Sequence, residues 1–259
     1  MIAIAILGLG EAGSAIAADL VAAGADVRGF DPLVQPPAGV AARTDDADAA
    51  RDADLVLSLN SAHDARGALD NALPALRPGT VWAEMNTTSP GLKRELAEVA
   101  SAHAVEVVDV ALMATVLGRG LATPMEVAGP AAARFAAMLG PLGASVDVVG
   151  GPVGTAISRT LLRSVFYKGL AAAVVEALAG AEVAGCADWL RQNIAGEMAG
   201  FDERTLDRLV TGSRKHAHRR VGEMAAAAEQ LRELGVQPRI AGAAENLLRE
   251  LDLGRPQST

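Results

Sequence analysis

The sequence predicts an α/β chain in which a doubly wound, mostly parallel sheet is followed by an all-helical domain. Three observations support this. Short apolar runs alternate with longer helical patterns over residues 1–150. A glycine-rich turn follows the first apolar run directly. After Gly150-Gly151-Pro152 no strand pattern remains. Strands that alternate with helices are typical of a sheet with helices on both faces, so we expect domains at residues 1–150 and 151–259.

The first three elements define the repeating unit. Ile2–Leu7 is a continuous apolar run without alternation, which is typical of a strand buried on both faces. A helix is predicted over residues 13–23, where Gly24 ends the helical spacing, and Asp26–Phe30 is the second strand.

The unit then repeats along the first domain. No element is predicted in the acidic stretch that follows the second strand and contains Asp45, Asp46, Asp48 and Asp52. Helices are predicted over residues 64–73 and 90–103. The remaining predicted strands are Asp54–Leu59, Thr80–Met85, Val105–Val110, Met125–Ala128 and Ser145–Val149.

From Val153 onward the pattern is helical throughout. Glycine positions predict the breaks between helices, because glycine favours helix ends and turns. We expect breaks near Gly185, Gly200, Gly212 and the segment 235–238, and a frayed tail from Gly254.

Composition limits the classes of function. The chain has 259 residues, of which 51% are hydrophobic, 21% charged and 3% aromatic, so a packed core built from small side chains is expected. The net charge of −8 argues against a nucleic-acid partner. Residues 1–150 carry 9 Lys and Arg against 18 Asp and Glu, whereas the remainder carries 14 against 13. The second half is therefore the better place for an anionic substrate.

Cysteine usage and the N-terminal run indicate the compartment. Cys186 is the only cysteine, which excludes an internal disulfide and a thiolate cluster. No His, Asp and Glu group has metal-ligand spacing, so no metal is expected. The run Met1–Leu9 lacks a basic flank and is too short for a signal peptide or a membrane span. We expect a cytoplasmic chain with no membrane partner.

The strongest motif is a Rossmann-type glycine turn that follows the first strand and opens the first helix. The first glycine permits the tight turn, the second lets the backbone approach a pyrophosphate, and the third lets helix and strand pack closely. Free N–H groups at the helix start then face the phosphates. The predicted cofactor-binding residues of this turn are Gly8, Leu9, Gly10, Glu11, Ala12 and Gly13.

Asp31, at the end of the second strand, is the predicted ribose ligand. An acidic residue about 20 positions after the turn bonds the ribose hydroxyls of NAD and repels the 2′-phosphate of NADP. NAD is therefore expected, with NADP less favoured, and nearby Arg28 weakens the preference only slightly. Asn60 and Ser61 end the third long strand, on the side where ligands bind such sheets.

At this point the chain resembles the β-hydroxyacid dehydrogenases, which include 6-phosphogluconate and 3-hydroxyisobutyrate dehydrogenases and, as relatives, imine reductases. Their Gly-Leu-Gly-x-Met-Gly opening appears with Ala12 in place of Met. Their Asp-Met-Ser-Thr-x-x-Pro loop appears as residues 84–90. The resemblance implies that Asn86 contacts the cofactor and that Thr87 and Thr88 contact the substrate. It covers nearly the whole chain, and the run 163–169 points to a 6-phosphogluconate-dehydrogenase-like branch.

The chain departs from the family at three site positions. Met113 stands where the family has its substrate-binding Ser. Thr160 stands at the position of the catalytic Lys and Ser164 at that of the Asn. Neither hydroxyl carries the positive charge of Lys, so the family's mechanism does not transfer unchanged.

The long helix offers replacement groups. Thr160, Ser164 and Lys168 are spaced i, i+4, i+8 and share one face. Lys168 or Tyr167 is our candidate for moving the proton, with Ser164 beside them, and Arg163 is the candidate clamp for an anionic group. The alternative is that these charges lie on a solvated helix face.

A basic segment at residues 214–220 contains His216 and His218. It is interpreted either as part of a pocket for an anionic substrate or as a solvated face. Apolar stripes at Leu170–Ala181 and Met224–Leu234 predict a homodimer through the helical domain, as the resembling family commonly forms.

Three functions remain open. The first is an NAD(P)-dependent dehydrogenase that transfers a hydride between nicotinamide and a small anionic hydroxyacid. The second is an imine or enamine reductase, for which the missing Lys is expected. The third is a protein that senses NAD(H) without turnover.

Overall fold

The computed structural model describes residues 2–254 of the chain, and the predicted frayed tail beyond Gly254 lies outside them. Contacts within the chain divide it into two units, residues 1–163 and 164–259. The first unit contains the sheet, and the second contains most of the helical part.

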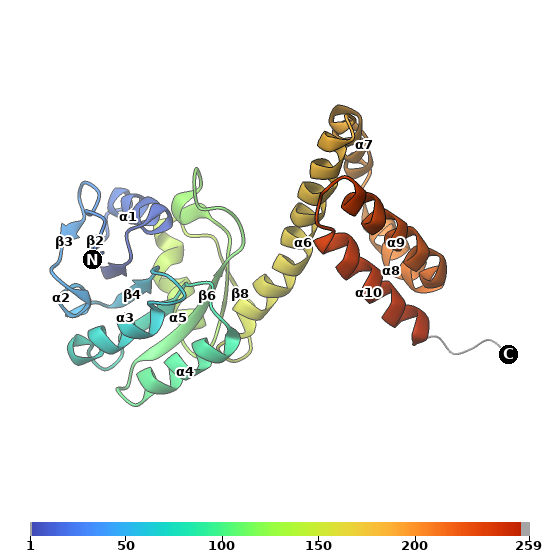
Figure 1. The fold of residues 1–259 in the computed structure, drawn as a ribbon. Coiled ribbons are helices and arrows are strands. Elements are labelled where there is room, and N and C mark those ends of the chain that lie inside the picture. Colours follow the sequence, from blue (N-terminus) through green and yellow to red (C-terminus); the bar gives the residue numbers. More distant parts are fainter. Residues whose placement is uncertain (1, 255–259) are drawn as a thin grey trace. The chain divides into compact units, whose positions relative to one another are not determined.

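One sheet organises the first unit (Figure 1). Its order is β3-β2-β1-β4-β5-β6-β7-β8, and neighbouring strands run parallel except at the antiparallel β6–β7 pair. The order reverses direction between β1 and β4, and ligands bind doubly wound sheets at that point. The strands are β1 Ala3–Leu7, β2 Asp26–Phe30, β3 Ala41–Ala42, β4 Leu55–Ser58, β5 Val81–Glu84, β6 Glu106–Leu112, β7 Met125–Ala128 and β8 Val146–Val148.

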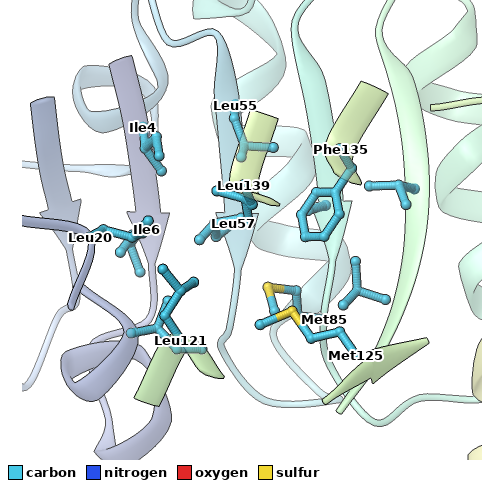
Figure 2. Close-up of a cluster of buried hydrophobic side chains, with 14 of the residues drawn as sticks. Ile4, Ile6, Leu20, Leu55, Leu57, Met85, Leu121, Met125, Phe135 and Leu139 are labelled. Carbon is cyan, nitrogen blue, oxygen red and sulfur yellow. The ribbon is translucent and has the colours of Figure 1, made fainter. Parts of the chain in front are cut away.

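Helices cover both faces of the sheet, which confirms the expected doubly wound architecture. On one face α1 (Glu11–Ala22) and α5 (Ala132–Leu139) pack against side chains such as Ile4 and Ile6 (Figure 2). On the other face α2 (Asp46–Ala50), α3 (Ala65–Ala72) and α4 (Pro90–Ser101) pack against Ala5 and Leu7. Because side chains alternate along a strand, an apolar run without alternation serves both cores.

The sequence pattern missed three elements of this unit. β3 has two residues, which is too short for a periodic signal. The acidic stretch forms α2, because the Asp45 carboxylate accepts a hydrogen bond from the Asp48 N–H at 2.7 Å and caps the helix. α5 fills the interval between β7 and β8, where no element was predicted.

The second half is helical, as expected, and no described residue after β8 forms a strand. The helices are α6 Thr155–Val183, α7 Ala187–Ala199, α8 Glu203–Lys215, α9 Ala217–Glu233 and α10 Arg239–Leu253. The break predicted near Gly212 lies a few residues further on: α8 continues through Gly212 and the chain breaks at His216. A single glycine within a helix costs only about 1 kcal/mol and does not by itself end it.

α6 is long and apolar enough, by length and composition, to cross a membrane, and few of its residues are buried. Its exposed apolar side chains include Leu162, Val165 and Val175.

Candidate functional site

The glycine turn between β1 and α1 is shaped by two contacts that exclude side chains. Gly8 has a φ of +97°, and a Cβ there would lie 2.5 Å from the Leu59 carbonyl oxygen. A Cβ on Gly13 would lie 2.0 Å from the Gly8 carbonyl oxygen. These two positions require glycine for the fold itself.

Gly10 differs from its neighbours. Apart from Gly10 itself and its two neighbours in sequence, no atom of residues 2–254 comes within 4 Å of the position that a Cβ would occupy there. Packing therefore does not require glycine at this position, whereas close approach of a pyrophosphate to the backbone does. The first N–H groups of α1 lack partners within the helix and supply donors for the phosphates. The turn thus fits an NAD(P) pyrophosphate.

A cavity of about 680 Å³ opens beside this turn. It brings together five of the predicted cofactor residues, Gly8, Gly10, Asp31, Asn60 and Ser61. The predicted Leu9, Glu11, Ala12 and Gly13 belong to the same turn and the first turn of α1 but do not line the cavity. The other lining residues are Phe30, Pro32, Leu33, Asp46, Leu59, His63, Asp64, Gly67, Ala68 and Asn71.

Asp31 is held in place by backbone donors. Its Oδ2 accepts a hydrogen bond from Leu9 N at 2.8 Å. Its Oδ1 accepts from Leu33 N at 2.8 Å and Val34 N at 2.9 Å. A carboxylate has about four acceptor sites, so capacity for a ribose hydroxyl remains on Oδ2. The side chain therefore both joins β2 to the glycine turn and presents a fixed negative charge to the cavity.

A chain of hydrogen bonds fixes the polar groups at the ends of β4 and β5. Ser58 Oγ donates to Asn60 Oδ1 at 2.8 Å. Asn86 Nδ2 donates to Ser58 Oγ at 3.1 Å and to Glu84 Oε1 at 2.8 Å. Burial raises the pKa of the Glu84 carboxyl, while the charge of Lys93 and the hydrogen bond from Asn86 act against that rise. The two predicted residues Asn60 and Asn86 are thus linked and oriented through Ser58.

The sequence analysis missed a buried ion pair behind these groups. Lys93 Nζ is fully buried and donates to Asp109 Oδ1 at 2.8 Å, Glu84 O at 2.7 Å and Val110 O at 3.0 Å. These bonds use all three ammonium donors. The sequence contained a signal for the burial of Lys93, because this residue lies at helical spacing from Leu96 and Ala100, which are buried on the same face of α4.

Asp109 extends this ion pair to the start of α6. Its Oδ2 accepts hydrogen bonds from Gly154 N at 2.9 Å and Ile157 N at 3.1 Å. A carboxylate at a helix N-terminus satisfies free N–H groups and interacts favourably with the helix dipole. The pair therefore attaches α4 and the first turn of α6 to the centre of β6.

Two residues that depart from the family pattern touch each other. The Thr160 hydroxyl lies 3.1 Å from Met113 Sδ and donates to it. Thr160 is buried and Met113 is half-buried. In the predicted substrate loop, Thr88 is buried and Thr87 is exposed. No charged group occupies the Thr160 position, so any acid or base has to come from elsewhere.

The other predicted substrate and catalytic residues lie further along the chain. Arg163 is the last residue of the first unit. Ser164, Tyr167 and Lys168 follow it on α6 and belong to the second unit, where Tyr167 and Lys168 are exposed. The Tyr167 ring meets Phe166 edge-on with centroids 5.1 Å apart. Their roles stay predictions.

The histidines of the basic segment also belong to the second unit. His218 Nδ1 lies 3.1 Å from Asp252 Oδ2, and exposed His216 separates α8 from α9. Within residues 2–254, no group of His, Cys, Asp and Glu is placed to hold a metal ion.

A Rossmann sheet, an open glycine turn and a fixed acidic residue at the end of β2 together define an NAD(P)-binding protein. Comparison with known families agrees. Residues 3–150 match the NAD binding domain of 6-phosphogluconate dehydrogenase, and residues 181–251 match a domain of unknown function, DUF1932. The chain belongs to the β-hydroxyacid dehydrogenase superfamily, in its 6-phosphogluconate-dehydrogenase-like part.

Individual proteins are also similar to this chain. A probable 3-hydroxyisobutyrate dehydrogenase of Mycobacterium tuberculosis is 34% identical over 129 residues, which are 48% of this chain and 44% of that protein. The match thus spans less than half the length of this relative. A solved conserved hypothetical protein from Sinorhizobium meliloti 1021 is 30% identical, with a TM-score of 0.63, and the alignment covers 100% of this chain and 91% of that one.

Imine reductases share the fold. The Myxococcus stipitatus enzyme in complex with NADP⁺ is 20% identical with a TM-score of 0.79, covering 97% of this chain and 94% of that one. Its V8 variant in complex with NAD⁺ is 21% identical, also with a TM-score of 0.79, covering 98% and 95%. The shared fold therefore accommodates both nicotinamide cofactors.

The buried ion pair gives a stability prediction. Lys93→Met should lower the free energy of unfolding by about 3–5 kcal/mol, because Asp109 would remain buried without its cation. Urea denaturation of the purified chain measures this. The control is Arg66→Met, which breaks an exposed pair with Asp70 and should change stability far less. Equal effects of the two substitutions would contradict the assignment.

Proposed function

We propose that this chain is an NAD-dependent oxidoreductase that transfers a hydride between nicotinamide and a small, anionic hydroxyacid-type substrate. The observation that carries the proposal is the open backbone at Gly10, at a cavity that Asp31 also lines. Family membership supports hydride chemistry, since relatives are named as 3-hydroxyisobutyrate dehydrogenases.

The preference for NAD over NADP rests on Asp31. Three backbone N–H groups hold its carboxylate, so it cannot easily turn away from a ligand at the ribose position. A fixed negative charge there favours ribose hydroxyls and repels a 2′-phosphate. Both cofactors occur on this fold, so the choice depends on residues of this chain.

Bound nicotinamide would supply the carbon that accepts the hydride, and the chain has to take the proton of the alcohol. Thr160 has no charge for this task, and its hydroxyl is engaged with Met113. Lys168 lies two turns after Thr160 on the same face of α6 and is our candidate proton carrier. Tyr167 is the alternative. Ser164 lies between Thr160 and Lys168 on that face.

The anionic part of the substrate needs cations and donors. Arg163 presents a planar fork of donors that suits a carboxylate. The proposed supporting contacts are Met113, Thr160, Thr87, Thr88, His216 and His218. The positive balance of the second half favours an anion there.

Reduction of an imine is the second candidate. It is favoured by the Thr160–Met113 contact, which replaces a charged lysine with an uncharged pair. An imine needs a proton on nitrogen as it accepts the hydride, so the same groups on α6 would act as acid rather than base.

Turnover tests these assignments. The full chain should oxidise 3-hydroxyisobutyrate with NAD⁺ or reduce a cyclic imine with NADH, followed by nicotinamide absorbance. Lys168→Ala should lower kcat by about 10²–10⁴-fold, because it removes the proposed acid–base group. The affinity for NADH should not change.

The control is Arg249→Ala, an exposed cation on α10 paired with Glu245, which should leave kcat unchanged. Unchanged turnover of Lys168→Ala would remove this lysine from the mechanism. Tight NADH binding without turnover of any hydroxyacid or imine would favour the sensor.

We also propose that the chain is a cytoplasmic homodimer through its helical unit. Large apolar side chains there are exposed, including Val175, Val183 and Trp189. A second copy would cover them and account for the apolar character of α6 without a membrane.

The oligomeric state is measured by light scattering after gel filtration in detergent-free buffer. We expect twice the chain mass of 26.4 kDa, and a shift toward monomer in Trp189→Glu, because the new charge would be buried at the interface. A monomer at micromolar concentration, or a requirement for detergent, would contradict the proposal.

A further inference from the structure

Contacts to the phosphates and the ribose of a dinucleotide do not account for all the residues that line the cofactor cavity. The glycine turn accounts for the pyrophosphate and Asp31 for the ribose. Some of the other residues that line the cavity come from the turn after β2 and from α2 and α3, among them Leu33, Asp46, Gly67 and Asn71. The part of a dinucleotide beyond that ribose is its base.

Two of these positions suit a flat aromatic ring. Leu33 is 93% exposed, so its large apolar side chain packs against little of the chain itself. At Gly67 α3 presents no side chain, and outside the backbone of α3 and the two sequence neighbours no described atom lies within 4 Å of the position a Cβ would take. Contact with a base would remove the apolar surface of Leu33 from water.

Asp46 adds a directional polar group to the same cavity. It is only 8% exposed, and its Oδ2 accepts a hydrogen bond from Asn71 Nδ2 at 3.1 Å. Its Oδ1 accepts no hydrogen bond from the residues described (2–254) and is not among their fully buried atoms without a partner, so it stays accessible at the wall of the cavity. Burial is the main cause that raises the pKa of the Asp46 carboxyl; the hydrogen bond from Asn71 acts against this rise, and the charge of Asp45 adds to it. An accessible carboxylate oxygen with no partner in the chain can accept a hydrogen bond from a donor on a ligand.

We propose that Asp46 determines base specificity: its Oδ1 accepts a hydrogen bond from the exocyclic amino group of adenine, while Asn71 holds the carboxylate in place. This inference rests on the proposed dinucleotide function and adds a discrimination within it. Hypoxanthine carries a carbonyl oxygen where adenine carries the amino group. That oxygen would face the carboxylate with no proton between them, so the site should select adenine dinucleotides over their deaminated analogues.

The test is a pair of titrations on the full-length chain, with NADH and with reduced nicotinamide hypoxanthine dinucleotide, followed by nicotinamide fluorescence. The wild-type chain should bind the hypoxanthine analogue about 10–100-fold more weakly, the effect of losing one hydrogen bond to a charged acceptor. Asp46→Asn should bring the ratio of the two affinities close to one, because an amide presents either a donor or an acceptor to the base.

The matched control is Asp70→Asn, which makes the same change on α3 at an exposed residue that does not line the cavity. It should keep the wild-type ratio. Partial unfolding of a variant lowers both affinities together, so the ratio reports the base alone.

Equal wild-type affinities for the two dinucleotides, with NADH bound tightly, would overturn the role of Asp46 and leave the proposed function standing. An unchanged ratio in Asp46→Asn would also overturn it. Failure to bind either dinucleotide would contradict both the proposed function and this inference.

Discussion

The contact between Gly8 and Gly13 is the constraint on which the rest of the site depends. A side chain at Gly13 would overlap the Gly8 carbonyl oxygen, so β1 and α1 can meet this closely only through glycine. That approach brings the N-terminus of α1 to the end of β1, next to the reversal of strand order between β1 and β4. Gly10, Asp31 and the polar ends of β4 and β5 acquire their places from this geometry.

The Lys93–Asp109 ion pair positions the start of α6, as the contact between Gly8 and Gly13 positions the start of α1. A buried ion pair contributes little net stability when both partners are well bonded, but it is expensive to disrupt. Here it joins α4, β6 and the first turn of α6 through bonds to Gly154 and Ile157. We interpret the Lys93–Asp109 pair as the interaction that fixes where α6 begins. The start of α6 in turn fixes the position of Thr160, which belongs to the first unit.

Local patterns predicted the parts of this structure that depend on local physics. The buried strands, α1 and α4 follow from apolar periodicity and from glycine and proline positions, and the glycine turn from its spacing. Predictions failed where tertiary context decides. The acidic stretch has no periodic pattern and was predicted to lack an element, but Asp45 caps α2 there. Gly212 indicated a break between helices, but α8 continues through it. The Lys93–Asp109 pair joins residues 16 apart in sequence, which periodicity does not register.

The most direct test of the central claim is a parallel titration of NADH and NADPH into the wild-type chain and Gly10→Ala. The account predicts saturable binding with preference for NADH. It predicts that the methyl group of Gly10→Ala weakens binding without lowering the thermal midpoint, since no described residue other than its two sequence neighbours lies within 4 Å of that position. Binding of neither dinucleotide, or full binding by Gly10→Ala, would contradict the account, and tighter binding of NADPH would overturn the role given to Asp31.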